Sequence, residues 1–158
     1  MNLLCRAGTS LVTVLFSAFA ISGGVLADGI ADQVTVSDPY VRAVPPVVRT
    51  SAAFMQLRSS DASERFLVGA ESPAAGAAEL HMHTMDDGVM RMRQIPHIHL
   101  PPNQTVSLEP GGLHIMLFDL KAPLLPGEQI PITLTFEDGS TKDVTAMVRP
   151  VEGMMMKH

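Results

Sequence analysis

Cysteine is almost missing from this chain of 158 residues, because Cys5 is the only one. It lies in an N-terminal segment typical of a secretory signal, with Arg6, an apolar run over Leu11–Ile21 and the small-residue cleavage sequence Val25-Leu26-Ala27. Cleavage there removes residues 1–27 and leaves a mature chain with no disulfide, thiolate ligand or cysteine nucleophile. Because Cys5 lies far upstream of the cleavage point, lipidation is not expected.

Aromatic residues and positive charge are also scarce. The sequence has no Trp, its aromatic share is 4%, and its formal net charge is −5. The acidic balance argues against a nucleic acid as partner. The core must therefore be built from Val, Leu, Ile, Ala and Met. The apolar run of the signal is too short for a comfortable membrane span, so we expect a periplasmic protein with no membrane span after cleavage.

Long helical patterns are absent as well, and short alternating segments take their place. The predicted strands lie at residues 33–37, continued after a break at Asp38-Pro39 by an extended segment at 40–44, and at 51–58, 65–71, 78–85, 89–95, 105–108, 113–120, 129–136 and 141–148. Asp-Gly sequences at 87–88 and 138–139 predict two hairpins. About nine short strands with turns between them indicate an all-β sandwich or small barrel. We expect one domain over residues 28–150 and a flexible, Met/His-containing tail at 151–158.

One stretch, Glu79–Met116, concentrates residues with ligand chemistry. It holds five of the six histidines and five of the 11 methionines. Strand periodicity predicts that Leu113, Ile115 and Leu117 face a core. His114 and Met116 then lie together on the opposite face. His81 and His83 likewise share one face of their strand.

The register of the first hairpin decides whether its two strands contribute to one site. A four-residue loop pairs Met85 with Met90 and brings His81 and Met92 to the same side. A three-residue loop pairs Met85 with Val89 and separates them, unless a β-bulge restores the first arrangement. We predict that His81 and Met92 converge on one face.

Histidine and methionine together favour one metal. Thioether sulfur is soft and neutral, so it prefers Cu(I) to Zn²⁺, Mg²⁺ or Ca²⁺, and imidazole adds a stronger donor. Neither side chain forms disulfides in an oxidising compartment. Imidazole must be neutral to bind, so affinity should fall at low pH. The stretch therefore predicts a site that captures and releases Cu(I) outside the cytoplasm.

Plainer interpretations apply to several of these residues. Met is a common core filler, and Met55 and Met147 occupy core-like strand positions. His83, His97 and His99 can be surface residues. The last two flank Ile98 on a Pro-bounded loop, which could be a secondary site or a lid.

The spacing of the ligand types resembles a known family. His81, ten residues, Met92, twenty-one residues and then His114-Ile115-Met116 reproduce the H-x10-M-x21-H-x-M pattern of PCu(A)C-type periplasmic copper chaperones. Met82 fills the optional methionine after the first histidine. The sequence around the site is similar too, at 72–75, 79–81, 88–93, 108–112 and 124–139, so the resemblance covers nearly all of the mature chain.

This resemblance implies a cupredoxin-like Greek-key fold that binds one Cu(I) through His81, Met92, His114 and Met116. It also implies delivery toward the CuA centre of cytochrome c oxidase, with the CuA subunit and a Sco-type thiol protein as partners. Some members carry a Met/His-rich C-terminal extension that holds Cu(II) or assists transfer. The accessory metal candidates are therefore Met82, His83, Met90, Met154, Met155, Met156 and His158.

The sequence leaves other functions open. A copper buffering or tolerance protein needs the same ligands as a chaperone. A β-sandwich interaction module with incidental His and Met is a more distant alternative. Blue-copper electron transfer requires a Cys ligand that the mature chain lacks. A copper enzyme would use mostly His ligands with an open position, so we expect a carrier and not an enzyme.

Overall fold

The computed structural model describes residues 29–150. The signal segment and the tail expected at 1–27 and 151–158 therefore lie outside the described residues. The elements are α1 (Ile30–Gln33), β1 (Val34–Arg42), β2 (Ser51–Ser59), β3 (Arg65–Glu71), β4 (Ala77–Asp86), β5 (Val89–Gln94), β6 (Ile98–Leu100), β7 (Thr105–Leu108), β8 (Leu113–Phe118), β9 (Gln129–Phe136) and β10 (Thr141–Arg149).

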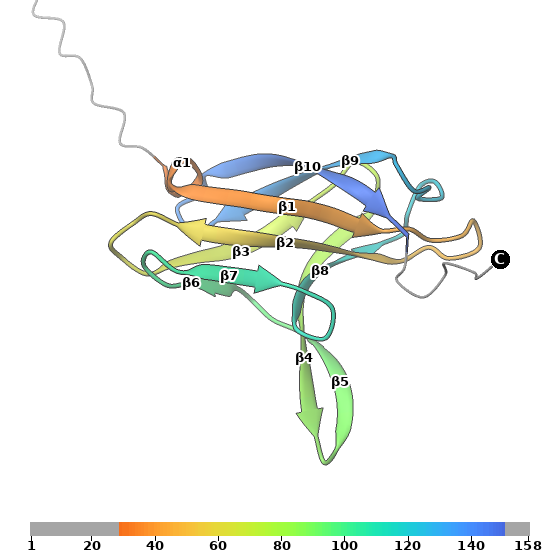
Figure 1. The fold of residues 1–158 in the computed structure, drawn as a ribbon, viewed down its shortest axis with the longest axis horizontal. Coiled ribbons are helices and arrows are strands. Elements are labelled where there is room, and N and C mark those ends of the chain that lie inside the picture. Colours follow the sequence, from red (N-terminus) through yellow and green to blue (C-terminus); the bar gives the residue numbers. More distant parts are fainter. Residues whose placement is uncertain (1–28, 151–158) are drawn as a thin grey trace, which may run out of the picture.

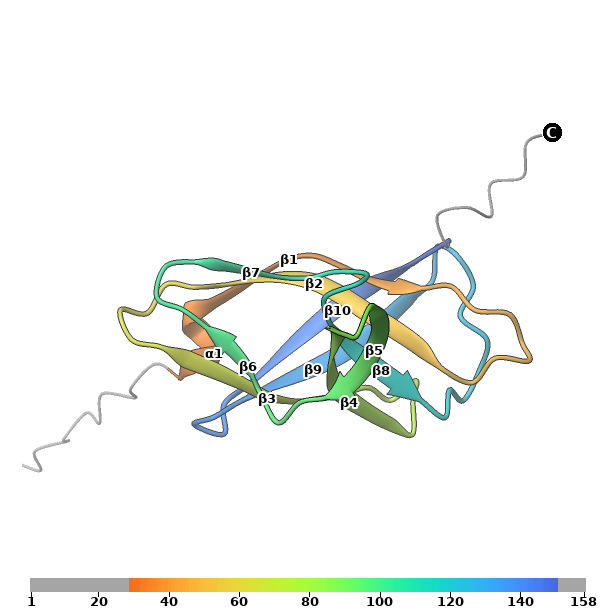
Figure 2. The same ribbon diagram turned by 90° about the horizontal axis from the view of Figure 1, so that it is seen from below.

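The strands form one continuous ladder that closes into a sandwich. Their order is β5-β4-β8-β7-β2-β1-β10-β9-β3-β6, and β8 also pairs with β2. In Figure 2, β1, β2 and β7 run along one side of the molecule, with β3 and β6 along the other. The fold is an all-β, cupredoxin-like sandwich, as the sequence predicts.

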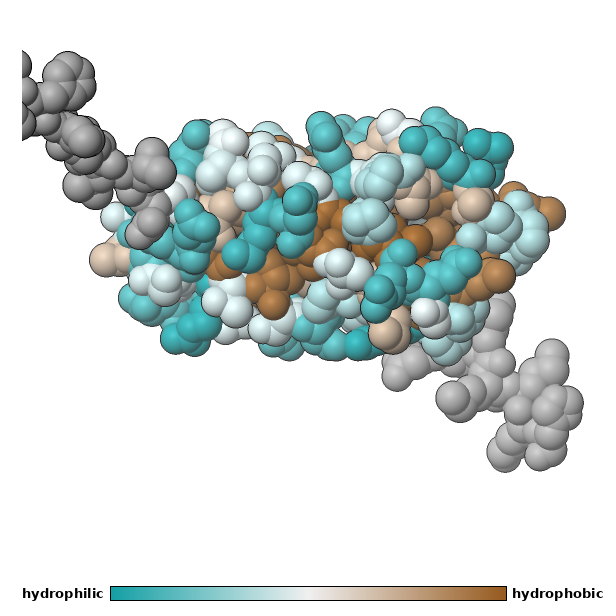
Figure 3. Space-filling view, turned by 90° about the horizontal axis from the view of Figure 1, so that it is seen from above, coloured by the Kyte–Doolittle hydropathy of each residue, from teal (hydrophilic) through white to brown (hydrophobic). Residues whose placement is uncertain are grey.

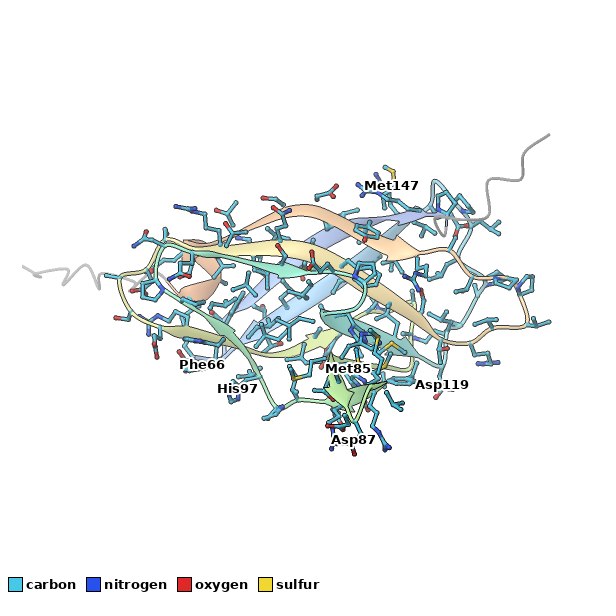
Figure 4. All side chains as sticks on the ribbon, turned by 60° about the horizontal axis from the view of Figure 1, so that its bottom comes forward. Phe66, Met85, Asp87, His97, Asp119 and Met147 are labelled. Atoms are coloured by element: carbon cyan, nitrogen blue, oxygen red, sulfur yellow. The ribbon has the colours of Figure 1, made fainter. Side chains whose placement is uncertain are left out.

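The core follows from period-2 burial. In β9, alternate residues from Ile130 to Phe136 are buried, and in β10 the buried residues are Val144, Ala146 and Val148. Met55 is also buried, as predicted. The core position expected for Met147 is wrong, because the register of β10 turns Ala146 and Val148 inward and leaves Met147 45% exposed. Figure 4 shows Met147 directed away from the sandwich.

Three local features differ from the sequence prediction. The break expected at Asp38-Pro39 is a register irregularity inside a continuous β1, where Asp38 has a φ of 48°. The loop expected at 96–104 contains β6, whose Ile98 pairs with Leu67 of β3. The helical turn α1 was not foreseen. It is held from the far end of the chain, since Ile30 N–H donates to Asp138 Oδ2 at 2.9 Å.

One hairpin projects from the body of the sandwich. β4 and β5 extend away from the remaining strands on the underside of the molecule in Figure 1. Every residue of β5 is exposed, and β4 is its only neighbour in the ladder. The hairpin is therefore anchored through β4, which pairs with β8.

The face opposite the hairpin is mixed in character. Figure 3 shows apolar groups gathered along the middle of that face, between rims of hydrophilic side chains. Within residues 29–150, the structure contains no helix with the length and apolar character needed to cross a membrane.

Candidate metal centre

The candidate site begins with the pairing of β4 and β8. This antiparallel register places His81 opposite His114 and Glu79 opposite Met116. Directly opposed residues of an antiparallel pair lie on the same face of the sheet. The ladder alone therefore places two imidazoles and a thioether on one face, although these residues are up to 35 positions apart in the sequence.

The β4–β5 register adds the remaining thioethers. Met85 pairs with Met90 and His83 with Met92, the first of the two registers considered, and the alternative Met85–Val89 pairing is not formed. The loop is shorter than expected, because Asp86 also pairs with Val89 and leaves only Asp87-Gly88 between the strands. His81 and Met92 consequently share one face of the hairpin, one diagonal step apart. The predicted convergence of these two residues is confirmed at the level of strand register.

A cleft of about 480 Å³ opens where the hairpin meets the sandwich. Its walls come from β2, β4, β5, β8, the end of β1 and the loops beside them. The potential ligands on these walls are His83, Met90, Met92, His114 and Met116. Arg42 and Phe54 line the other side. His81 is not on the wall, but its ring lies beside that of His114, with 5.9 Å between their centres.

His114 is the most deeply buried polar group of the site. It is 1% exposed, its Nδ1 lies 3.0 Å from the Gly112 carbonyl oxygen, and its Nε2 has no hydrogen-bond partner among the described residues. Burial lowers the pKa of His114 below its ordinary value, and the hydrogen bond to the Gly112 carbonyl opposes this effect. The charges of His83, His81 and Arg42 lower it further. His114 therefore stays neutral, the form that coordinates metal.

The other two imidazoles also carry buried nitrogen atoms without partners. His81 Nε2 lies 2.9 Å from Glu79 Oε2, while Nδ1 is unpartnered. His83 Nδ1 is likewise unpartnered, and its ring centre is 4.9 Å from that of His114. Buried polar atoms without partners are rare and costly, so three at one place indicate a group that binds there.

Thioethers lie beside the imidazoles. Met92 is 46% exposed and Met90 is 57% exposed, while Met116 is half-buried on β8. No group of three or more His, Cys, Asp or Glu side chains within residues 29–150 is arranged to hold a metal ion. The donors at the cleft are instead mixed imidazole and thioether, a combination suited to a soft ion such as Cu(I).

The structure sorts the accessory candidates differently from the sequence. His83 and Met90 lie at the cleft, although His83 was weighed as a surface residue. Met82 lies on the opposite side of β4 from His81 and pairs with Arg93 and Leu113. Met154, Met155, Met156 and His158 lie outside the described residues.

The second histidine pair lies elsewhere. His97 and His99 contact Phe66, with ring-centre distances of 4.9 Å and 5.3 Å, and His99 Nε2 lies 3.5 Å from Glu64 Oε1. Figure 4 shows His97 and Phe66 together, apart from Met85 on the projecting hairpin. The two histidines flank an aromatic ring and do not contribute to the cleft.

Comparisons with known proteins identify the family of the chain. A protein-family model described as "Putative lipoprotein LpqE-like" matches residues 34–148. The "Putative lipoprotein Lxx21020" of Leifsonia xyli subsp. xyli is 38% identical over 124 residues, covering 78% of this chain and 74% of that protein. The "Uncharacterized protein RP573" of Rickettsia prowazekii is 33% identical over 102 residues, or 64% and 56% of the two chains.

Solved structures show the same fold. The solution structure of CuI-DR1885 from Deinococcus radiodurans has a TM-score of 0.61 and 35% identity, covering 82% of this chain and 85% of that one. The copper-bound PCuAC domain from PmoF2 has a TM-score of 0.64 and 23% identity, covering 75% and 93%. The second similarity concerns the fold alone.

Proposed function

This chain belongs to the LpqE-like, PCu(A)C-type family, and on that premise we propose that it is a periplasmic copper chaperone that binds one Cu(I) ion. The proposed ligands are His81, Met92, His114 and Met116. The observation that carries the proposal is the buried, unpartnered Nε2 of His114 at a cleft that Met92 and Met116 also line. An orphaned imidazole beside two thioethers is costly without a metal and suitable for one.

Two further findings support copper as the cargo. The Deinococcus protein of similar sequence was solved with Cu(I), and the PmoF2 domain of the same fold was solved with copper. The exposed thioether of Met92 gives a partner access to one side of the ion. Because ligand exchange needs such access, the geometry suits a carrier that releases its ion, and we propose no enzymatic activity.

The test of the site uses two methionines of nearly equal exposure. Met92 is 46% exposed at the cleft and Met147 is 45% exposed on β10, away from it. Cu(I) titration against a chromophoric competitor should give one ion per wild-type chain and per Met147→Ala chain. Met92→Ala should bind far more weakly. Equal affinity of the two variants would remove Met92 from the ligand set.

We further propose that the ion is delivered toward the CuA centre of cytochrome c oxidase, together with a Sco-type thiol protein. This step rests on the family resemblance. Cu(I)-loaded protein mixed with an apo CuA domain should lose its copper to that domain. Retention of the ion, together with copper sensitivity but normal oxidase assembly after gene deletion, would favour the alternative function of buffering or tolerance.

Three further elements of the proposal concern the chain ends and the remaining candidates. We propose export through cleavage near Ala27, which N-terminal sequencing of the periplasmic protein would check. His83 and Met90 are proposed as accessory donors because they line the same cleft. Cu(II) at Met154–Met156 and His158 is tested by removing residues 151–158, which should abolish any Cu(II) site without changing Cu(I) affinity.

If the chain were an interaction module without metal function, replacing both β8 donors would have no effect on copper. The double variant His114→Leu/Met116→Leu keeps two apolar side chains of similar size at these positions. Unchanged Cu(I) affinity in this variant would support the interaction module.

A further inference from the structure

We propose that Glu79 is a positioning residue that fixes the ring state of His81, so that the two histidines bind Cu(I) through different nitrogens: His81 through Nδ1 and His114 through Nε2. This inference rests on the proposed copper function. It assigns a role to a residue outside the ligand motif.

The first step is the contact between Glu79 and His81. Both lie on the same face of β4, two residues apart, and Glu79 Oε2 is 2.9 Å from His81 Nε2. A carboxylate only accepts hydrogen bonds, so the hydrogen must be on Nε2. In a neutral imidazole the lone pair is then on Nδ1. This is the nitrogen that is buried and unpartnered.

The second step is the opposite arrangement at His114. Its Nδ1 lies 3.0 Å from the Gly112 carbonyl oxygen, which also only accepts. The hydrogen is therefore on Nδ1 and the lone pair on Nε2, again the buried and unpartnered nitrogen. Each ring has one nitrogen anchored by an oxygen acceptor and the other left free as a donor to metal.

The third step is the difference between the two anchors. A backbone carbonyl holds His114, whereas a carboxylate holds His81. An outer carboxylate on a ligating histidine fixes ring orientation and raises the basicity of the free nitrogen. Glu79 is opposite Met116 across the β4–β8 pair, so its carboxylate is placed beside the proposed ion as well as beside its ligand.

The decisive measurement is made first on the copper-free protein. Two-bond ¹⁵N–¹H correlation spectra at neutral pH should show hydrogen on Nε2 in His81 and on Nδ1 in His114. On adding Cu(I), which is diamagnetic, the coordination shift should appear at His81 Nδ1 and His114 Nε2. Hydrogen on His81 Nδ1 in the copper-free wild type, or a copper shift at His81 Nε2, would overturn the proposal.

Three substitutions test whether Glu79 positions the ring of His81 or only stabilises the fold. Glu79→Ala should lower Cu(I) affinity about 10- to 100-fold, the usual effect of losing an outer-shell partner. Its His81 nitrogen shifts should also move toward those of a ring exchanging between tautomers. Glu79→Gln keeps a neutral acceptor and should recover most of the loss. Glu71→Ala, an exposed carboxylate on β3, should match wild type.

Glu79→Ala affinity within twofold of wild type would overturn the inference even if copper binds as proposed. Failure of the wild type to bind Cu(I) would instead refute the proposed function. The copper-free spectra would still decide the tautomers in that case, so the two failures are distinguishable. If Glu79→Ala does not fold, the wild-type spectra with and without Cu(I) still decide which nitrogen of each ring carries hydrogen and which binds the ion.

Discussion

The two hairpins of this molecule that contain Asp-Gly turns lie in different surroundings. One is part of the sandwich, and the other projects from it. β9 and β10 join through a turn at Asp138-Gly139, and both strands alternate buried and exposed residues. β4 and β5 join through Asp87-Gly88, but β5 has no buried residue. In both turns the glycine has a positive φ, 81° at Gly139 and 78° at Gly88, but only in the β4–β5 turn does the preceding aspartate share it, with a φ of 50° at Asp87. Positive φ at both central residues is typical of the tight two-residue hairpin turn, so the two turns differ in type although both contain Asp-Gly.

The difference lies in what the strands carry and what they contact. The β9–β10 turn is tied to α1 by Asp138 and Ser140, and the apolar stripes of both strands fill the core. The β4–β5 turn is supported by an exposed ion pair between Arg93 and Asp86. The comparison shows that a hairpin with an Asp-Gly turn can either pack in the sandwich or project into solvent. The side chains of its strands decide which.

The largest expected effect tests the structural hairpin. Leu134 on β9 is fully buried, so Leu134→Ala should lower the free energy of unfolding by about 2–5 kcal/mol through lost transfer energy and a cavity. Met90 on the projecting hairpin is 57% exposed, so Met90→Ala should change it by no more than about 0.5 kcal/mol. Urea unfolding of the copper-free protein measures both. Similar losses in the two variants would contradict the conclusion that β9–β10 stabilises the fold and that the projecting hairpin does not.

The next effect tests the binding side of the comparison with His114→Leu. The copper-free variant should be about as stable as wild type. The substitution removes the buried imidazole, whose Nε2 has no hydrogen-bond partner, and puts an apolar side chain in its place. The Gly112 carbonyl still accepts the N–H of His83 at 3.2 Å. With free Cu(I) at 100 times its Kd, wild type should gain about 2.7 kcal/mol of stability and the variant almost none. A full gain in the variant would exclude His114 as a ligand.

A smaller effect concerns pH. Because the pKa of His114 is lowered by burial from its ordinary value of 6.5, the unfolded chain takes up its proton more readily than the folded one. Its contribution to stability is therefore complete above pH 6.5 and is lost as the pH falls toward the folded-state pKa, by at most about 1.4 kcal/mol per pH unit.

The measurement is the urea midpoint of the copper-free protein at a pH above and a pH below 6.5. The midpoint of His114→Leu should fall less on acidification than that of wild type. If both fall equally, another group is responsible for the acid sensitivity.

The smallest effects come from the carboxylates at the two turns. Asp138→Ala removes acceptors for Ile30 N–H and for Ser140, and should cost about 1 kcal/mol. Asp86→Ala removes an exposed ion pair with Arg93 and should cost less than that. Thermal unfolding of the two variants side by side tests the ranking, and the reverse order would show that the projecting hairpin is the better anchored one.

Sequence reasoning succeeded where structure is set locally. The bounds of β3, β7 and β9 match their predicted ranges, and both Asp-Gly turns form as expected. Period-2 alternation correctly placed His114 and Met116 on one face. The sequence left two registers open for the first hairpin, and the structure forms the one that pairs Met85 with Met90. These features depend on neighbouring residues, which a single sequence displays.

Features set by distant contacts were not predictable in the same way. β6 is a strand only because β3 supplies its partner and the core buries Ile98 and Leu100. His83 approaches His114 because β4 pairs with β8, which no periodicity within β4 reveals. Its spacing from His81 was the available signal. Ligation by His81, Met92, His114 and Met116 stays a prediction, which Cu(I) titration of the wild type and the variants tests.

The free edge of β5 has a consequence for self-association. A fully exposed end strand offers unpaired backbone groups to any passing chain, and such edges promote aggregation. Here Arg91 and Arg93 project from the strand with side chains about 60% exposed, at 62% and 60%. Two copies that paired through this edge would bring four guanidinium groups together. Charged side chains on an end strand oppose such pairing, so Arg91 and Arg93 protect this edge while the methionine face of the hairpin stays exposed.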